Sequence, residues 1–175
     1  MWYVRTSKNA RPHAAGVCNF YSYFMYDIPV KIKLLREDAK IPAYQTAGSA
    51  ACDLSACLDE PVTLLPGQSA LIPTGIALAP AADGEPAAAL IYARSGLAVR
   101  HGIALVNGVG VIDSDYRGEI KVGLINLSSE PYTVRSGERI AQMIFTPVRR
   151  GVFTEVSELD NTERGSGGFG STGTK

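Results

Sequence analysis

The sequence contains few side chains that bind metals or act as strong nucleophiles. Its 175 residues include two histidines, His13 and His101, and three cysteines, Cys18, Cys52 and Cys57, with no Cys-x-x-Cys spacing. We therefore expect neither a structural zinc centre nor a histidine-rich catalytic metal site. An odd number of cysteines without a secretory signal indicates a reducing compartment, so the sequence predicts a cytoplasmic protein with buried thiols.

The chain also lacks an excess of charge and a long apolar run. Lysine plus arginine and aspartate plus glutamate both number 17, so we expect no nucleic acid and no anionic membrane as a partner. No apolar run is long enough to span a bilayer. The Gly-x-x-x-x-Gly-Lys-[Ser/Thr] phosphate loop and the strand–helix alternation of common nucleotide folds are missing too. Any phosphate that the protein binds must be small and held locally.

With 46% hydrophobic and 19% charged residues, the chain fits one domain with a core and loose ends. Residues 1–26 contain no aspartate or glutamate but carry Arg5, Lys8 and Arg11. This N-terminal extension is interpreted as disordered or non-native, with the true start near Met25, or alternatively as a transit peptide that would direct the protein to an organelle.

From residue 30 onward, short alternating or apolar runs are separated by proline and glycine, a pattern typical of strands. Only residues 95–100 resemble a helical turn. An all-β chain of many short strands predicts a sandwich, a jelly roll or a barrel. The expected strands are 30–35, 52–56, 62–65, 69–72, 75–79, 87–93, 103–106, 109–112, 119–126, 132–134, 140–147 and 152–156.

The segment of residues 107–120, NGVGVIDSDYRGEI, is the richest in functional groups. Asn107-Gly108 between two apolar runs predicts a tight hairpin, whose free backbone groups could read the edge of a base. Asp113 and Asp115 then flank a turn that ends with Tyr116. These acids could simply form an Asx-turn. Alternatively, one carboxylate is a general base for water, and Tyr116 is a platform for a sugar.

Three further features, before and after this segment, carry polar groups that need partners or could bind a ligand. The triplet from Arg94 to Gly96 follows an apolar strand and could bind phosphate oxygens, or could be a surface arginine followed by a serine N-cap. Asp53 stands among small apolar residues, so it must pair with a backbone N–H or with the water shell of a magnesium ion. Gln142 lies within an apolar run, where its amide needs partners.

The C-terminal segment RGSGGFGSTG, residues 164–173, can contribute almost nothing to a core. It is either a flexible terminus or a lid that becomes ordered on a ligand, because ordering glycines is entropically expensive. Phe169 could stack on a flat ring while Arg164 meets an anion.

Together, five segments in this order resemble the motifs of the trimeric dUTP diphosphatases (dUTPases). They are AGSAACDL (47–54), ARSGLA (93–98), NGVGVIDSDYRGEI (107–120), GERIAQMIF (137–145) and RGSGGFGSTG (164–173). The chain departs from the family pattern at Ala51, where glycine is usual, and at Cys52, where a larger apolar residue or tyrosine is usual. The resemblance covers residue 30 to the C-terminus.

The resemblance implies a single-domain jelly roll of the β-clip type at residues 27–160, followed by a Gly-rich lid at residues 161–175. It implies a homotrimer whose three active sites are each assembled from all three subunits. The implied reaction converts dUTP to dUMP and pyrophosphate, which keeps uracil out of DNA and supplies dUMP for dTMP synthesis.

The resemblance also implies a role for each motif residue. Asp113 would be the general base, Tyr116 would lie under the deoxyribose, and Asp53 would act through water on a Mg²⁺ ion held by the triphosphate. The remaining substrate contacts would come from Arg94, Ser95, Gly96, Asn107, Gly110, Val111, Ile112, Lys121, Gln142, Arg164, Phe169, Gly170 and Ser171.

Two alternatives remain. A dCTP deaminase of the same superfamily needs a glutamate ten positions after the turn aspartate, where this chain has Gly123. A catalytically silent trimeric protein that binds the nucleotide as a signal would keep the motifs without turnover.

Overall fold

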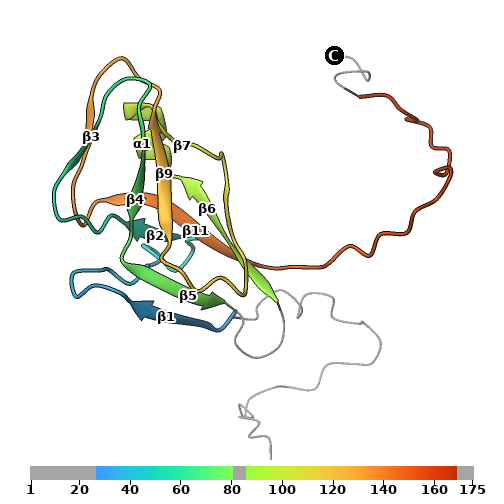
Figure 1. Ribbon diagram of the computed structural model, residues 1–175, viewed down its shortest axis with the longest axis horizontal. Helices are drawn as coiled ribbons and strands as arrows, with labels where there is room; N and C mark the ends of the chain where they lie inside the picture. Colours follow the sequence, from blue (N-terminus) through green and yellow to red (C-terminus); the bar gives the residue numbers. More distant parts are fainter. Residues whose placement is uncertain (1–26, 81–85, 169–175) are drawn as a thin grey trace, which may run out of the picture.

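Eleven short strands and one short helix make up the part of the chain that the computed structural model describes, residues 27–80 and 86–168 (Figure 1). The expectation of an all-β chain is confirmed. The elements, in chain order, are β1 (Val30–Leu34), β2 (Cys52–Ser55), β3 (Val62–Leu64), β4 (Ser69–Pro73), β5 (Ile76–Pro80), β6 (Ala87–Ala93), α1 (Ser95–His101), β7 (Ile103–Leu105), β8 (Gly110–Ile112), β9 (Lys121–Asn126), β10 (Tyr132–Val134) and β11 (Arg139–Pro147).

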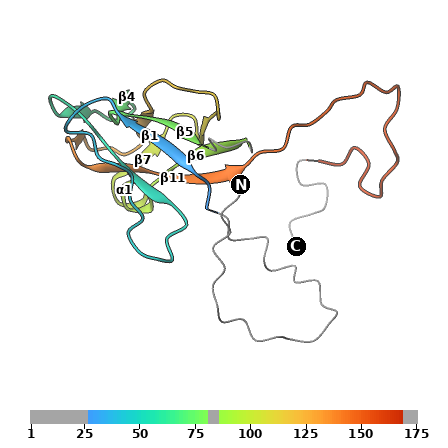
Figure 2. The ribbon, with the colours of Figure 1, turned by 90° about the horizontal axis from the view of Figure 1, so that it is seen from below.

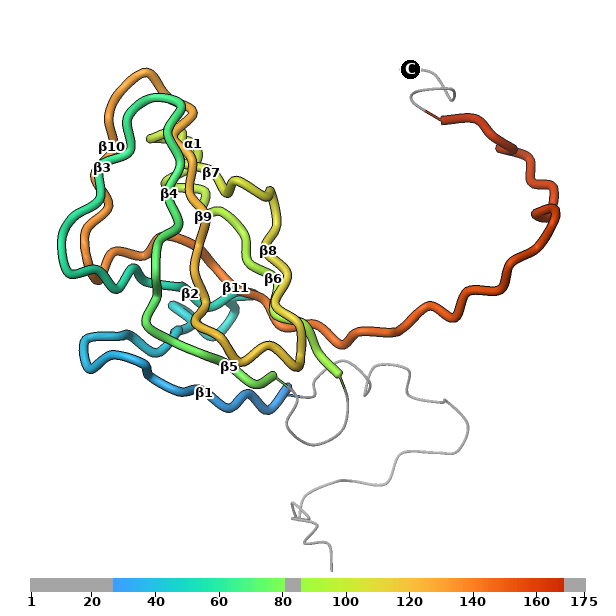
Figure 3. Tube along the Cα trace, in the orientation of Figure 1, coloured from blue at the N-terminus to red at the C-terminus, as the bar shows by residue number. Residues whose placement is uncertain are grey.

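The strands form four antiparallel sheets, and most pairs join strands that are distant in sequence. The largest sheet has the order β2-β11-β6-β8, and a second has the order β4-β9-β7. The pairs β1-β5 and β10-β3 complete the set, and Figure 3 shows β10 beside β3 and β8 beside β6. Strand β11 is the longest and pairs with β2 on one side and β6 on the other, so it connects two of the sequence motifs.

The core lies between these sheets and follows the alternation of the strands. In β9, Val122, Leu124 and Asn126 are buried while the residues between them are less so, as expected for a strand with one face on the core. Strand β6 is buried along most of its length, and its alanines allow close packing. The largest fully buried apolar side chains are Leu54, Leu64, Ile72, Ile76, Ile103, Ile120, Leu124, Val134, Ile140 and Met143.

Eleven of the twelve expected strands are found with ends within two residues of the expected ones, and the twelfth is wrong. Residues 152–156 form no strand. Val152 and Phe153 are 92% and 97% exposed, and Figures 1 and 2 show this segment leading away from the sheets. β-branched and aromatic residues favour a strand only where a neighbouring strand offers a hydrogen-bonding edge, and none is paired with this segment among the described residues.

The predicted hairpin around Asn107-Gly108 is half right. Gly108 does form a tight turn, with a φ of +70° and an N–H that donates to the Leu105 carbonyl at 3.2 Å. The flanking strands do not pair with each other, however, because β7 joins β9 and β8 joins β6. The turn therefore transfers the chain from one sheet to another.

Helix α1 begins directly after β6. Its N-cap is Arg94, with no capping side-chain bond, so the alternative of Ser95 as the N-cap is wrong. The helix ends at Gly102, whose φ of +65° is the left-handed conformation typical of a helix C-terminus. Among the described residues, no helix is long and apolar enough to cross a membrane.

Candidate active site

Most of the described site residues line one of two separate hollows. A hollow of about 400 Å³, called here the arginine hollow, is lined by Gln45, Ser49, Ala50, Ala51, Asp53, Tyr92, Arg94, Ser95, Gly96, Gln142 and Ile144. A hollow of about 440 Å³, called here the aspartate hollow, is lined by Leu71, Val111, Ile112, Asp113, Tyr116, Glu119 and Lys121. The sequence motifs thus meet in two groups within one chain.

Asp53 anchors the arginine hollow by holding two guanidinium groups. Its Oδ1 forms an ion pair with Arg94 Nε at 2.9 Å, and its Oδ2 accepts a hydrogen bond from Arg139 Nη1 at 2.9 Å. Arg94 Nη1 also donates to the Arg139 carbonyl at 3.0 Å. Two of the three Arg94 nitrogens are therefore engaged within the chain, and Nη2 has no partner among the described residues. The partner of Asp53 is a pair of arginines, which the sequence reasoning did not consider.

The rest of the arginine hollow supplies neutral polar groups beside this cation. Ser95 and Gly96 are exposed at the start of α1. Gln142 lies on β11 opposite Tyr92 of β6, and its Nε2 donates to the Ala93 carbonyl at 2.9 Å. The amide of Gln142 is thus satisfied within the apolar run, and its oxygen is left to accept a further bond. Arg139 does not line the hollow, but it pairs with the second oxygen of Asp53, so the cluster of Asp53, Arg94 and Arg139 carries a net positive charge at the hollow's edge, which suits an anionic ligand.

Asp113 follows β8 in the aspartate hollow and is exposed. Among the described residues its carboxylate accepts no hydrogen bond, and neither it nor Asp115 makes the side-chain bond of an Asx-turn. The turn is closed instead by the Tyr116 N–H, which donates to the Asp113 carbonyl at 3.2 Å, and by Arg117 Nη1, which donates to the Ser114 carbonyl at 2.7 Å. The Asp113 carboxylate therefore remains available to a water molecule.

Tyr116, Glu119 and Lys121 form the other polar wall of the aspartate hollow. The Tyr116 hydroxyl donates to the Glu119 carbonyl at 3.1 Å. One Glu119 oxygen accepts from the Gly75 N–H at 2.9 Å, and the other lies 3.6 Å from Lys121 Nζ. Glu119 thereby attaches the turn to the residue before β5 and pairs with Lys121, which lines the same hollow as Asp113 and Tyr116.

Strand β8 borders the same hollow with one edge unpaired. It is the terminal strand of its sheet and pairs only with β6 among the described strands. The backbone of Gly110, Val111 and Ile112 therefore has hydrogen-bonding groups available on its outer side. Asn107 lies in the exposed turn before β8 and lines neither hollow. Gly110 packs closely on β6, because a Cβ there would lie 3.1 Å from Ile91 Cβ.

The two hollows lie toward opposite ends of β6. In the antiparallel register Ile112 faces Ala89, so Asp113 lies near the start of β6, whereas Arg94 follows its end. Five residues at about 3.3 Å each separate Ala89 from Arg94, which is a distance of roughly 17 Å along the strand. The structure therefore does not bring Asp113 and Arg94 of one chain to the same point.

Arg164 lies in the segment after β11 and contacts neither hollow of its own chain. Its Nε donates to the Gly167 carbonyl at 2.9 Å, and Figures 1 and 2 show this segment well away from the sheets. Three further predicted substrate-binding residues, Phe169, Gly170 and Ser171, lie outside the described residues.

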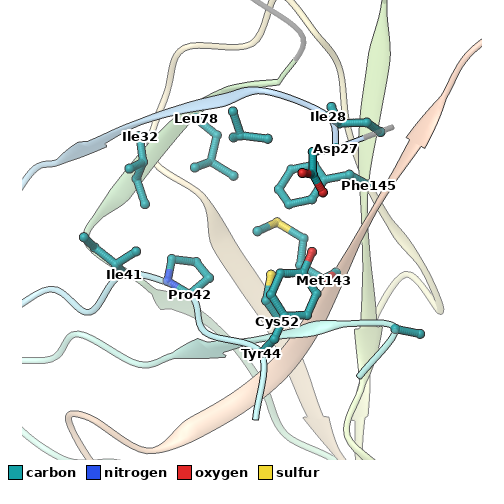
Figure 4. Close-up of a pocket in the computed structure, with 12 residues that line it drawn as sticks. Asp27, Ile28, Ile32, Ile41, Pro42, Tyr44, Cys52, Leu78, Met143 and Phe145 are labelled. Atoms are coloured by element: carbon teal, nitrogen blue, oxygen red, sulfur yellow. Dashed lines mark hydrogen bonds between the residues drawn. The ribbon is translucent and has the colours of Figure 1, made fainter. Parts of the chain in front are cut away.

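A third cavity, of about 470 Å³, is lined mostly by apolar side chains, with Asp27 as the one charged residue and no cationic side chain among its described lining residues. Figure 4 shows Ile32, Leu78 and Met143 around it, with Cys52 and Tyr44 on one side. Burial raises the pKa of the Cys52 thiol and of the Tyr44 phenol, so both stay neutral. This cavity offers nothing to a phosphate.

Sequence reasoning gave no role to two residues that organise the hollows, Arg139 and Glu119. Each acts on a residue that is distant in sequence: Arg139 on Asp53, and Glu119 on Gly75. The pairing of β2 with β11 would have revealed the first contact, but no local pattern indicates that pairing.

Comparison with known proteins assigns this arrangement to a family. The family model described as dUTPase matches residues 37–173. The chain belongs to the dUTPase family. The proposed resemblance is therefore confirmed over nearly the same range that the five motifs covered.

Similar dUTPases are found among bacteria and phages. The chain is 54% identical over 151 residues to a deoxyuridine 5′-triphosphate nucleotidohydrolase of Desulfitobacterium hafniense, a match that covers 85% of this chain and 99% of the relative. A Hahella chejuensis enzyme of the same name is 51% identical, with 85% and 96% covered. Among solved structures, the dUTPase of Staphylococcus bacteriophage 80alpha with dUPNHPP is 25% identical with a TM-score of 0.74, and the match covers 83% of this chain and 99% of the phage chain. The jelly-roll-like β fold of these dUTPases confirms the predicted fold class.

Proposed function

We propose that this protein hydrolyses dUTP to dUMP and pyrophosphate, with Asp113 as the general base. The activity follows from membership of the dUTPase family, at 54% identity to a nucleotidohydrolase of that name. The observation that carries the catalytic assignment is the exposed Asp113 carboxylate beside Tyr116 and Lys121 in one hollow. This activity keeps dUTP away from DNA synthesis and supplies dUMP.

In this reaction Asp113 holds a water molecule and takes its proton as the oxygen attacks the α-phosphorus. The bond from the α-phosphorus to the bridging oxygen breaks, and pyrophosphate leaves with that oxygen. The turn bonds from Tyr116 and Arg117 fix the backbone on which Asp113 stands, so the carboxylate is positioned before substrate arrives. Lys121 offsets negative charge at the attacked group.

The base and sugar are recognised at the same hollow. The unpaired edge of β8, at Gly110, Val111 and Ile112, is suited to hydrogen bonds with the edge of uracil, and Asn107 can add its amide. A short strand held against β6 leaves little room for the methyl group of thymine. Tyr116 would lie under the deoxyribose, where an added 2′-hydroxyl would collide with its ring.

The phosphate chain would lie against the arginine hollow. Arg94 Nη2, the Ser95 hydroxyl and the Gly96 N–H would bind the phosphate oxygens, while Gln142 assists from β11. Asp53 and the Arg139 carbonyl keep the Arg94 guanidinium in one orientation, which lowers the entropy lost on binding. At the other end of the chain, the lid at residues 161–175 would cover the nucleotide, with Phe169 on uracil and with Arg164, Gly170 and Ser171 over the terminal phosphate.

Magnesium fits this site only as an ion brought in by the nucleotide. The described residues contain no group of three or more histidine, cysteine, aspartate or glutamate side chains that could hold a metal. Asp53 is the one carboxylate in the arginine hollow, and both its oxygens bind arginine. Mg²⁺ keeps several waters and needs few carboxylates, so Asp53 would contact it through water. The ion would supply charge neutralisation on the triphosphate.

The site would be completed by other copies of the chain. A single triphosphate cannot easily reach both Asp113 and Arg94 of one chain, because Ala89, which faces Ile112 next to Asp113, already lies roughly 17 Å from Arg94 along β6. Arg164 also lies far from both hollows of the chain to which it belongs. A homotrimer in which one subunit supplies the aspartate hollow and another the arginine hollow resolves both separations. The free thiols Cys52 and Cys57 support a reducing cytoplasm as its location.

The test is hydrolysis of dUTP, dTTP, dCTP and UTP with Mg²⁺ by the wild type, by Asp113→Asn and by Asp115→Asn. We expect pyrophosphate release from dUTP alone, a loss of turnover of about 10⁴-fold in Asp113→Asn, and retained binding of a non-hydrolysable dUTP analogue. Asp115→Asn, the same change two residues away, should keep its rate. Undiminished turnover by Asp113→Asn would overturn the base assignment, and ammonia from dCTP would favour the deaminase. A version starting at Met25, assayed beside the full chain, tests whether residues 1–26 matter.

A further inference from the structure

We propose that Gly118 is a specificity-determining residue, because its missing side chain makes room for the Tyr116 ring in the position that excludes ribose. The proposal rests on the sugar-binding role given above to Tyr116. It concerns a residue that touches no substrate and acts through the tyrosine alone.

The Tyr116 ring occupies the space that any side chain at position 118 would need. A Cβ built on Gly118 overlaps the Tyr116 hydroxyl oxygen, lies 2.6 Å from Cζ and 3.0 Å from Cε2. Ordinary carbon–carbon contacts begin at about 3.5 Å. With alanine at position 118, the ring would have to move by roughly 1 Å.

The backbone itself does not require glycine at this position. The glycines with positive φ are Gly67, Gly75, Gly102, Gly108, Gly137 and Gly165 among the described residues, and Gly118 is not one of them. The left-handed φ that disfavours alanine is therefore absent at position 118. What excludes a larger residue at 118 is the tyrosine, and the tyrosine can move because it is 44% exposed.

Two hydrogen bonds hold the ring against Gly118. The Tyr116 N–H donates to the Asp113 carbonyl at 3.2 Å, and its hydroxyl donates to the Glu119 carbonyl at 3.1 Å. Glu119 in turn is attached to the domain through the Gly75 N–H at 2.9 Å. The ring is therefore tied at its backbone to the catalytic turn and at its hydroxyl to the fold.

The consequence for function is specific to the sugar. A ring whose hydroxyl end lies against Gly118 sets how closely a sugar can approach, and a displacement of about 1 Å is comparable to the size of the 2′-hydroxyl group that it must exclude. Base recognition at the edge of β8 involves no contact with Gly118. Moving the ring should therefore weaken discrimination between dUTP and UTP while leaving discrimination between dUTP and dTTP intact.

The experiment compares kcat/KM for dUTP, UTP and dTTP in the wild type, Gly118→Ala, Tyr116→Phe and a control, Gly48→Ala. A Cβ on Gly48 meets no atom within 4 Å, so this glycine-to-alanine change should leave both ratios unaltered. We expect Gly118→Ala to fold normally, and to lower the dUTP/UTP ratio by about 10-fold or more without changing the dUTP/dTTP ratio. Tyr116→Phe, which loses the bond to Glu119, should lower the dUTP/UTP ratio less.

The possible contrary results separate a failure of this inference from a failure of the proposed function. An unchanged dUTP/UTP ratio in Gly118→Ala, with dUTP still hydrolysed by the wild type, overturns this inference and leaves the proposed function standing. If Gly118→Ala lowers both the dUTP/UTP and the dUTP/dTTP ratio of kcat/KM, Gly118 is a general structural residue and the inference is wrong. The same conclusion follows if circular dichroism shows that Gly118→Ala is unfolded. A wild type that does not hydrolyse dUTP would overturn the proposed function and this inference with it.

Discussion

The Asp53 carboxylate allows a direct test of how far burial strengthens an ion pair in this fold. Its side chain is 11% exposed and binds Arg94 and Arg139 at 2.9 Å each. Asp59 binds Arg36 at the shorter distance of 2.7 Å, but its side chain is 85% exposed. Substitution of either aspartate by asparagine removes one negative charge and one acceptor oxygen with almost no change in volume.

The expected loss can be estimated bond by bond. The Arg94–Asp53 contact is a partly buried ion pair, which we place at about 2 kcal/mol, between the value of about 1 kcal/mol or less for exposed pairs and the loss of about 3–5 kcal/mol on breaking fully buried ones. The Arg139 side chain is 47% exposed, so its bond contributes only about 0.5–1 kcal/mol. Asparagine keeps one acceptor but turns an amide N–H₂ toward the second arginine. Asp53→Asn should therefore lower the free energy of unfolding by about 2–3 kcal/mol, whereas Asp59→Asn leaves Arg36 bound to Asp38 and should change little.

Urea unfolding at one fixed protein concentration measures both variants, because the midpoint of an assembling protein depends on concentration. For a chain of this size, 2–3 kcal/mol corresponds to a fall in melting temperature of about 4–12 °C. Asp53→Asn should also raise KM for dUTP, since it releases the Arg94 guanidinium. Equal midpoints for Asp53→Asn and Asp59→Asn would refute the reasoning, because they would show that burial adds nothing to this pair.

Two further predictions concern glycine packing and alkaline pH. Gly75→Ala should lower the free energy of unfolding by about 2–5 kcal/mol, because φ is +70° and the new Cβ would lie 2.7 Å from Ala39 Cβ. Gly67→Ala is the control: it has the same left-handed φ without a clash and should lower the free energy of unfolding by only about 1–2 kcal/mol. Equal losses for the two variants in thermal unfolding would contradict the packing argument. Burial, together with the neighbouring Glu138 carboxylate, raises the pKa of the Tyr132 phenol above its ordinary value of 10.0. The folded state thus favours the neutral phenol, and this stability is complete below pH 10 and is lost as the pH rises further. In urea titrations, Tyr132→Phe should be less stable than the wild type at pH 8, and this difference in the free energy of unfolding should shrink above pH 10. A difference that stays constant with pH would argue against the raised pKa of Tyr132.

The sequence was sufficient for the local elements and for some of the motif residues that lie together. Short apolar runs bounded by proline and glycine predicted the strands, because one-sided burial leaves a period of two in the sequence. The tight turn at Gly108 was equally visible, since a left-handed φ favours glycine. Asp113, Tyr116 and Lys121 were assigned to one place, and the structure does bring them into one hollow.

What the sequence could not predict was which strands pair and which groups therefore meet. The turn at Asn107 looked like a hairpin, yet β7 and β8 pair with strands elsewhere in the chain. The arginine partners of Asp53 come from β11 and from the end of β6, 86 residues away in the case of Arg139. Residues 152–156 had the composition of a strand but no partner among the described strands. Non-local pairing decides such contacts, and a local pattern does not record it.

The placement of Asp113 and Arg94 toward opposite ends of β6 also has a genetic consequence. If each active site draws its base from one subunit and its phosphate-binding arginine from another, a chain damaged at one end still carries an intact contribution at the other. Two inactive alleles, one altered at Asp113 and one at Arg94, could then form mixed trimers in which some sites receive only undamaged residues. Such a gene would show complementation between its own alleles, which a protein with a self-contained active site in each chain cannot show.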